Sequence, residues 1–205
     1  WASGRLTQGH PELTYAPSWV ASAEAVPLSL SLPLAQQAHS TQTVSAVLRG
    51  LLPDNEATLD RWASAFHVSA RNPLGMLAHV GEECAGAMQF VTDDRLDLVA
   101  SGALDAMAPL SDEDVAARLQ RVRHDVGATR RPDDPGQFSL AGAQAKIALL
   151  HTGQGWALPS GRIPTTHILK PPSGDFSGYV ENEVFCLALA REMGLHAASS
   201  YRLQI

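Results

Sequence analysis

Lysine is the residue type that this sequence most clearly lacks. Of its 15 lysines and arginines, only Lys146 and Lys170 are lysines. A general preference for arginine explains the scarcity, but it does not explain why both lysines fall in one short region. A lysine ammonium is a compact point charge and an arginine guanidinium is a wide planar fork, so a site that needs one ammonium beside a phosphate does not accept arginine freely. The pattern favours a functional role for Lys170.

Cysteines and long apolar runs are also scarce. The two cysteines, Cys84 and Cys186, lie far apart within apolar patterns, which predicts two buried free thiols in a reducing compartment. No apolar stretch approaches the roughly 18 residues of a membrane helix, and no secretory leader pattern is visible. We therefore expect a cytoplasmic protein with no membrane segment.

The sequence lacks the motifs of several classes of functional site. The eight histidines show no HExxH or CxxC partner spacing, which argues against a zinc site, and no GxSxG elbow of a serine hydrolase occurs. The net charge of −6 argues against a basic surface for nucleic acid. With 205 residues, 45% of them apolar and 18% charged, the chain has material for one or two packed domains.

The first part of the chain combines strand and helix patterns. Residues 27–34 alternate apolar and small polar residues between two prolines, which is typical of a half-buried strand. Helical spacing then predicts three helices, beginning near Ser40, near Asn55 and at Pro73. A further strand is expected at 85–91. Residues 1–92 are therefore predicted to form a β-rich N-terminal subdomain with short helices.

Residues 93–133 are predicted to connect this subdomain to the next one. Ser111 and Asp114 have the spacing of a capping box and predict a helix after them. The scattered acids of this region lack metal-ligand spacing, so a solvated connector is favoured over a metal site. The turn-forming run at 130–136 is the best domain boundary.

The third region, 134–205, is predicted to carry the chemistry. It reads as a strand, a small-residue turn, two further strands, a fourth strand ending at Lys170, and a helix over about 180–193. Gly142 precedes Lys146 by four positions, without the second glycine and the hydroxyl of a Walker A loop. Small side chains in such a turn still expose backbone N–H groups to an anion.

Glu183 is the predicted partner of Lys170. It follows that lysine by 183 − 170 = 13 residues, in the expected first turn of the helix. In kinases, a strand lysine holds the nucleotide phosphates and pairs with a helix glutamate. Glu183 could equally be a carboxylate that complements the helix dipole, and Glu181 is the alternative partner for the lysine.

A series of motifs runs in order along nearly the whole chain. They are YAPSW at 15–19, PLSLSLPL at 27–34, LLPDN at 51–55, SLAGAQAK at 139–146, PTTHILK at 164–170 and NE at 182–183. With these motifs the chain resembles the HipA family, serine/threonine kinases that are the toxins of bacterial HipBA toxin–antitoxin modules.

The resemblance implies a site and partners. The family binds ATP and Mg²⁺ and phosphorylates a serine of a protein target, such as glutamyl-tRNA synthetase. Ser139 matches a loop serine whose autophosphorylation ejects the loop and silences the kinase. The residues that match the ATP-contacting positions are Ala141, Gly142, Ala143, Gln144, Ala145, Lys146 and Lys170. The N-terminal subdomain resembles the part that helps contact the DNA-binding antitoxin HipB, so DNA would be reached only through the antitoxin.

The sequence departs from the family pattern in its extent. Family members continue into a larger helical lobe that holds the catalytic aspartate and the metal ligands. We therefore expect an α+β fold, with a kinase-like N-lobe of antiparallel sheet and one helix in 134–205, and no catalytic base or metal ligand within the chain. The intact protein is predicted to be a serine/threonine kinase, and residues 1–205 alone are predicted to be inactive.

Two alternatives remain open from the sequence. One is a non-catalytic binding module that engages a kinase partner or an antitoxin through residues 1–92. An in-frame helical lobe after Ile205 would favour the kinase, and a stop codon there would favour the module. The other is an unrelated nucleotide-binding protein, which requires the resemblance to be accidental.

Overall fold

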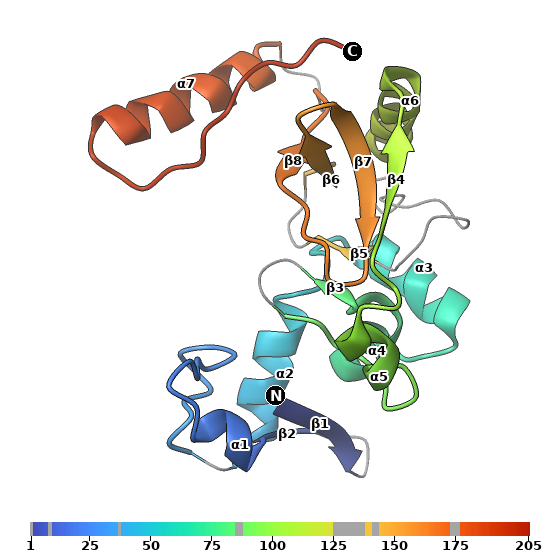
Figure 1. Ribbon diagram of the computed structural model, residues 1–205, viewed down its shortest axis with the longest axis vertical. Helices are drawn as coiled ribbons and strands as arrows, with labels where there is room; N and C mark the ends of the chain where they lie inside the picture. The colour runs from blue at the N-terminus through green and yellow to red at the C-terminus, as the bar shows by residue number, and fades with distance from the viewer. Residues whose placement is uncertain are drawn as a thin grey trace. The chain divides into compact units, whose positions relative to one another are not determined.

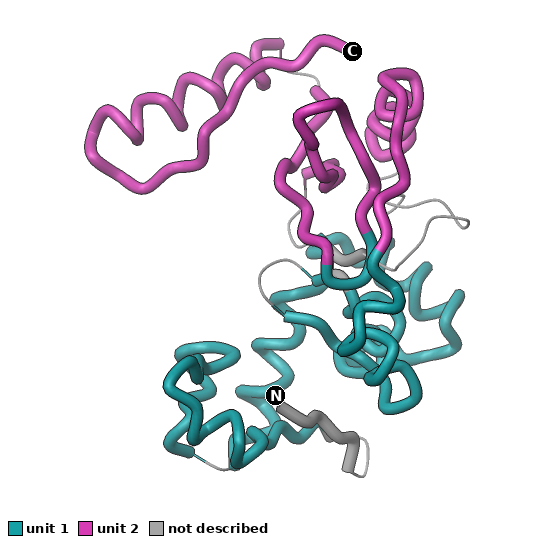
Figure 2. The backbone as a smooth tube through the Cα atoms, viewed as in Figure 1, with its two compact units in different colours: residues 1–105, 132–143, 160–162 teal, residues 106–131, 144–159, 163–205 magenta. Residues whose placement is uncertain are grey.

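The fold combines helices with small sheets, which confirms the predicted α+β class. The computed structural model describes residues 2–7, 10–36, 38–84, 88–124, 138–140, 144–172 and 177–205. Packing divides the chain into two compact units, of which unit 1 contains 1–105, 132–143 and 160–162, and unit 2 contains 106–131, 144–159 and 163–205 (Figure 2). These units follow packing and not consecutive segments, so the domain boundaries at 92 and 133 stay predictions.

Unit 1 is built mainly from short helices (Figure 1). Its elements are β1 (Ala2–Thr7), β2 (His10–Tyr15), α1 (Pro17–Val20), α2 (Thr41–Arg49), α3 (Glu56–Phe66), α4 (Pro73–Val80), β3 (Glu83–Cys84), α5 (Leu96–Ser101) and β5 (Phe138–Ser139). Strands β1 and β2 form an antiparallel pair, and β3 pairs with β5 in parallel.

Side-chain caps explain where the helices of unit 1 begin. The Ser40 hydroxyl, the Asn55 amide oxygen and the Asn72 amide oxygen each accept a hydrogen bond from the backbone N–H three residues later. Each cap satisfies one of the N–H groups that lack a partner in the first turn of a helix. The three helix starts expected from the sequence are therefore confirmed.

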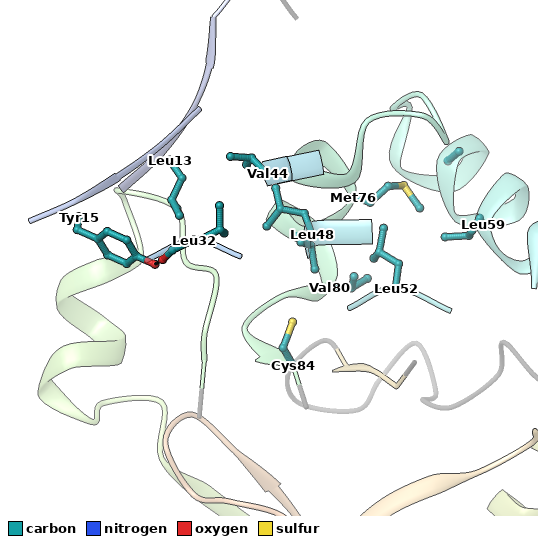
Figure 3. Packing of buried hydrophobic residues seen from close by; sticks show 12 residues of the cluster. Leu13, Tyr15, Leu32, Val44, Leu48, Leu52, Leu59, Met76, Val80 and Cys84 are labelled. Carbon is teal, nitrogen blue, oxygen red and sulfur yellow. Dashed lines mark hydrogen bonds between the residues drawn. The ribbon is translucent and has the colours of Figure 1, made fainter. Parts of the chain in front are cut away.

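Apolar side chains of these helices form the core of unit 1 (Figure 3). Val44 and Leu48, one helical turn apart on α2, are both buried, and so are Met76 and Leu77 on α4. The β1–β2 pair contributes Leu13 and Tyr15. The helical periodicity of 40–80 was therefore a sound guide to the buried faces.

The predicted strand at 27–34 is wrong. Residues 27–34 are all described and none of them lies in a strand, because Pro27 and Pro33 have no N–H to donate to a ladder and the chain between them turns, with Leu32 N–H bonded to Ser29 O at 2.9 Å. The Tyr15 hydroxyl, and not a neighbouring strand, hydrogen-bonds the backbone of this segment. It accepts from Leu28 N–H at 2.9 Å and donates to Leu32 O at 2.7 Å. The apolar alternation does not mark one buried face, because Leu32 is fully buried and Leu30 is 95% exposed.

The strand expected at 85–91 is also displaced. The structure has a strand at β3, two residues long, and residues 88–91 are not in a strand. Residues 85–87 of that expectation lie outside the described ranges.

The described part of unit 2 contains a four-stranded sheet and two helices. The sheet has the order β4 (Ala106–Leu110), β7 (Gly155–Ser160), β6 (Ile147–Thr152) and β8 (His167–Leu169), and the helices are α6 (Asp112–His124) and α7 (Tyr179–Glu192). Strand β6 is antiparallel to both β7 and β8. Within the described part of the chain, no helix is both long and apolar enough to cross a bilayer.

Helix α6 packs on this sheet through one apolar stripe. Val115 and Val122, two turns apart, are buried together with Ile147, Leu149 and Leu158 from the sheet. The helix begins at the predicted capping box, in which Ser111 N–H bonds the Asp114 carboxylate and Asp114 N–H bonds the Ser111 hydroxyl, both at 3.2 Å.

One acid of the predicted connector has a structural partner within unit 1. Asp105 accepts hydrogen bonds from Arg162 N–H at 2.8 Å and from the Arg162 guanidinium at 2.8 and 3.0 Å. These bonds lower the pKa of the Asp105 carboxyl. Gly161 has a positive φ of 68°, and a Cβ there would lie 2.4 Å from the Asp105 carboxylate. The turn after β7 therefore requires this glycine.

The two cysteines differ, so the prediction of two buried thiols is half wrong. Cys84 is buried in the unit 1 core, and its burial raises its pKa to about 12. Cys186 is exposed on α7, because no side chain of that helix is buried within the structure.

The Tyr15 hydroxyl should contribute measurably to stability. Replacing Tyr15 with Phe leaves Leu28 N–H and Leu32 O without their partner, and we expect the free energy of unfolding to fall by about 1–3 kcal/mol. Urea unfolding followed by circular dichroism measures the change. Tyr201→Phe is the matched control, since Tyr201 is exposed. Equal stabilities for the two variants would contradict the assigned role.

Candidate functional site

The candidate site is built around an ion pair between Lys170 and Glu183. Lys170 follows β8 directly, and its ammonium donates a hydrogen bond to a carboxylate oxygen of Glu183 on α7. Glu183 is the fifth residue of α7 and so lies in its second turn, not in the first turn as expected. The helix begins earlier than predicted, at Tyr179, and this moves Glu183 away from the positive end of the helix dipole.

The alternative partner, Glu181, lies elsewhere on α7. Its carboxylate is 3.2 Å from the Arg202 guanidinium, and that pair is well exposed. The sequence left the choice between Glu181 and Glu183 open, and the structure places Lys170 on Glu183. Two residues apart on a helix, the two carboxylates point in different directions, which is why only one reaches the lysine.

The Lys170–Glu183 pair fixes the position of the ammonium more than it stabilises the fold. The two side chains are 32% and 33% exposed, and an ion pair with that much solvent contributes only ~0.2–1 kcal/mol to folding. What the pair achieves is to hold one ammonium at a defined place at the end of β8. A fixed single positive charge of this kind can attract an anionic group such as a phosphate.

Strand pairing brings the second lysine to the same end of the sheet. Ile147 of β6 is the register partner of Leu169 of β8. Lys146 directly precedes β6 and Lys170 directly follows β8. Because the two strands are antiparallel, both lysines lie just beyond the same end of the β6–β8 pair. The only two lysines of the chain, 24 positions apart (170 − 146), are neighbours by topology.

The predicted loop is described only at its two sides. Ser139 lies in β5, whose backbone pairs with β3 in a register that aligns Ser139 with Cys84. On the other side, Gln144 and Lys146 are half-buried and Ala145 is buried in the core of unit 2. Ala141, Gly142 and Ala143 lie outside the described residues.

The opposite end of the β6–β8 pair carries an aromatic cluster that the sequence did not predict. His151, Trp156 and His167 have ring centroids 4.6–5.5 Å apart, and Tyr201 lies 6.4 Å from His167. The Thr166 hydroxyl accepts from His151 N–H at 2.9 Å and bonds His167 Nδ1 at 2.8 Å. No spacing signals the cluster, since its members come from three strands and the C-terminal segment.

The described residues offer no obvious site for a metal ion. Across the ranges given above, no group of three or more His, Cys, Asp or Glu side chains is placed to hold one. The ion pair and the two lysines are suited to binding an anion and not to binding a cation.

Comparison with known proteins identifies the family. A sequence model of the HipA N-terminal domain matches residues 1–91, and one of the HipA-like C-terminal domain matches residues 138–205. The chain belongs to the HipA family. The HipA models account for both the helical unit 1 region and the lysine-bearing sheet.

Individual HipA relatives agree with this assignment. A protein of Sinorhizobium fredii named "Putative kinase Y4mE" is 34% identical over 203 residues, which cover 95% of this chain and 47% of that protein. The "Serine/threonine-protein kinase toxin HipA" of Shewanella oneidensis is 31% identical over 183 residues, or 84% of this chain and 37% of the toxin. The names of these relatives make this a family of kinases.

A solved structure shares the fold. It is a chain of the Shewanella oneidensis MR-1 complex of HipA, HipB and operator DNA, with a TM-score of 0.70 and 27% identity over all of this chain and 45% of that one. The chain spans less than half the length of each of these three relatives.

Proposed function

We propose that the chain is the N-terminal part of a HipA-like toxin kinase that binds ATP. The observation that carries the proposal is the Lys170–Glu183 ion pair, at the same end of the β6–β8 pair as Lys146. A strand lysine held by a helix glutamate is the arrangement with which kinases position nucleotide phosphates. The kinase names of the relatives support the same reading.

In this proposal the chain contributes binding and orientation. The Lys170 ammonium would neutralise phosphate charge, and Glu183 would hold that ammonium in place. The residues from Ala141 to Lys146 would contact the phosphates from the loop between β5 and β6, largely through backbone N–H groups. Phosphoryl transfer depends mainly on such positioning and on electrostatic stabilisation.

The described residues do not fit the Mg²⁺ ion that family kinases use. No group of carboxylates among them is placed to hold it, so we derive no step through the metal from this chain. We propose that the metal ligands and the catalytic aspartate belong to the helical lobe of the intact protein. The acceptor would be a serine of a protein target, of which an aminoacyl-tRNA synthetase such as glutamyl-tRNA synthetase is the candidate.

The proposed regulator is a HipB-like DNA-binding antitoxin. A protein of that kind is part of the complex that contains the structural relative. Residues 1–92 are the proposed contact region, and DNA would be reached only through the antitoxin. Two thiols without a disulfide fit the reducing cytoplasm in which such a module would act.

Removing the lysine tests the site directly. The test uses the longer protein, which includes the part that its relatives have beyond this chain. Lys170→Ala removes the ammonium and should lower ATP affinity by about a hundredfold or more. Glu183→Gln should lower it by about tenfold, because the ammonium is no longer held in position. Isothermal titration calorimetry measures both. Glu181→Gln is the matched control, with the same change of charge on the same helix. Unchanged affinity in Lys170→Ala would remove Lys170 from the site.

The isolated residues 1–205 should show no turnover. Because we propose that the catalytic base and the metal ligands belong to the helical lobe, residues 1–205 should transfer no phosphate from radiolabelled ATP to protein, while the longer protein that includes this lobe should do so. Measured turnover by the isolated residues would refute this division of roles. Absence of transfer by the longer protein as well would favour the alternative, a binding module without kinase activity.

Phosphate on Ser139 should silence the intact kinase. It would add a charge of about −2 beside the phosphates of ATP, which disfavours their binding. Mass spectrometry after incubation with ATP should detect a phosphate at Ser139 in the active protein and none in Lys170→Ala, which serves as the control. An unmodified Ser139 in a demonstrably active kinase would contradict self-modification at this position.

A further inference from the structure

One stretch of unit 1 is almost free of charge. Between Glu12 and Arg49 the sequence has a single charged residue, Glu24, although 18% of the whole chain is charged. Part of the stretch is buried and needs no charge, as Leu32, Val44 and Leu48 show. The loop between α1 and α2 is different, because all of its described residues except Leu32 are exposed or half-buried.

The end of α1 and that loop expose three large apolar side chains, which we call the apolar loop surface: Val20 is the last residue of α1, and Val26 and Leu30 lie in the loop. Leu30 is 95% exposed, Val26 64% and Val20 45%. Exposed apolar side chains are ordinary when they are scattered singly, but here three fall within eleven residues whose only charged residue is Glu24. Depletion of charge is the compositional mark of the core of a protein–protein interface.

The backbone that carries the apolar loop surface is fixed by side chains. The Trp19 indole N–H donates to Val26 O at 3.1 Å, which ties α1 to the middle of the loop. The Tyr15 hydroxyl bridges Leu28 N–H and Leu32 O, on either side of Leu30. An exposed loop that is already ordered loses little conformational entropy when a partner binds.

The charges of this region decide which partner fits. No lysine or arginine occurs between Arg5 and Arg49, so the loop offers nothing to DNA phosphates or to an anionic membrane. Residues 1–100 contain 5 arginines and 10 acids, a net charge of −5. A second copy of the chain would meet that like charge, whereas a DNA-binding protein carries the positive charge that phosphates require and would be attracted.

We propose that Val20, Val26 and Leu30 form the docking surface for the HipB-type antitoxin. This inference rests on the proposed function, which names that partner but not the residues that meet it. The apolar side chains would enter a pocket of the antitoxin, and the bonds from Trp19 and Tyr15 would hold them in the geometry for docking.

Calorimetry tests the surface. The longer protein, which includes the part that its relatives have beyond this chain, is titrated with a HipB-type protein from the same genome. Leu30→Asp should weaken binding by about tenfold or more, because it places a charge in the core of the interface. Leu98→Asp is the matched control and should bind normally, since Leu98 is a 43% exposed leucine of the same unit on α5.

A second variant separates contact from pre-organisation. Trp19→Phe keeps an aromatic ring but loses the bond to Val26 O, and it should weaken binding by about two- to fivefold without altering the three apolar side chains. Circular dichroism should show both Leu30→Asp and Leu98→Asp folded as the wild type is, because both positions are exposed.

The outcomes distinguish this inference from the proposed function. If the wild-type protein does not bind the HipB-type protein, the proposed partner is wrong. If the wild type binds and Leu30→Asp binds equally well, the partner stands and the docking surface is overturned. If the wild type alone forms a dimer that Leu30→Asp abolishes, a second copy covers the surface and the inference is likewise overturned.

Discussion

The register of β6 against β8 is the constraint on which the candidate site depends. Because Ile147 is aligned with Leu169, Lys146 and Lys170 lie just beyond the same end of two antiparallel strands. A one-residue slip would also turn the buried Ile147, Leu149 and Leu169 away from the α6 stripe, so the core of unit 2 maintains the register. The position of the lysines is therefore a consequence of apolar packing, and Glu183 adds orientation at little cost in stability.

Unit 1 uses a different device for a similar purpose. Its core is made mainly of helices, and the described residues between α1 and α2, 21–36 and 38–40, form neither helix nor strand. Tyr15 and Trp19 order that chain through hydrogen bonds to its backbone, which leaves Leu32 buried and Leu30 exposed. Rigid irregular backbone that presents apolar side chains is well suited to recognising a protein partner.

Sequence reasoning succeeded where the signal was local. Ser40, Asn55 and the Ser111–Asp114 box lie where helices begin, because a capping side chain bonds the backbone of its own first turn. It failed where the partner is distant in sequence. The apolar alternation at 27–34 resembled a strand, but the hydroxyl that satisfies its backbone comes from Tyr15, and the aromatic cluster around His167 draws on three strands and the C-terminal segment.

The sequence by itself determined the α+β class and the positions of most helices, since these follow from periodicity and capping, and its composition singled out the two lysines as candidates. Only the tertiary structure decided that Glu183 and not Glu181 holds Lys170, that Cys84 is buried and Cys186 exposed, and that 27–34 turns. Each of those outcomes depends on which groups meet across the fold, and helix phase or strand pattern leaves more than one geometry possible until distant residues pack.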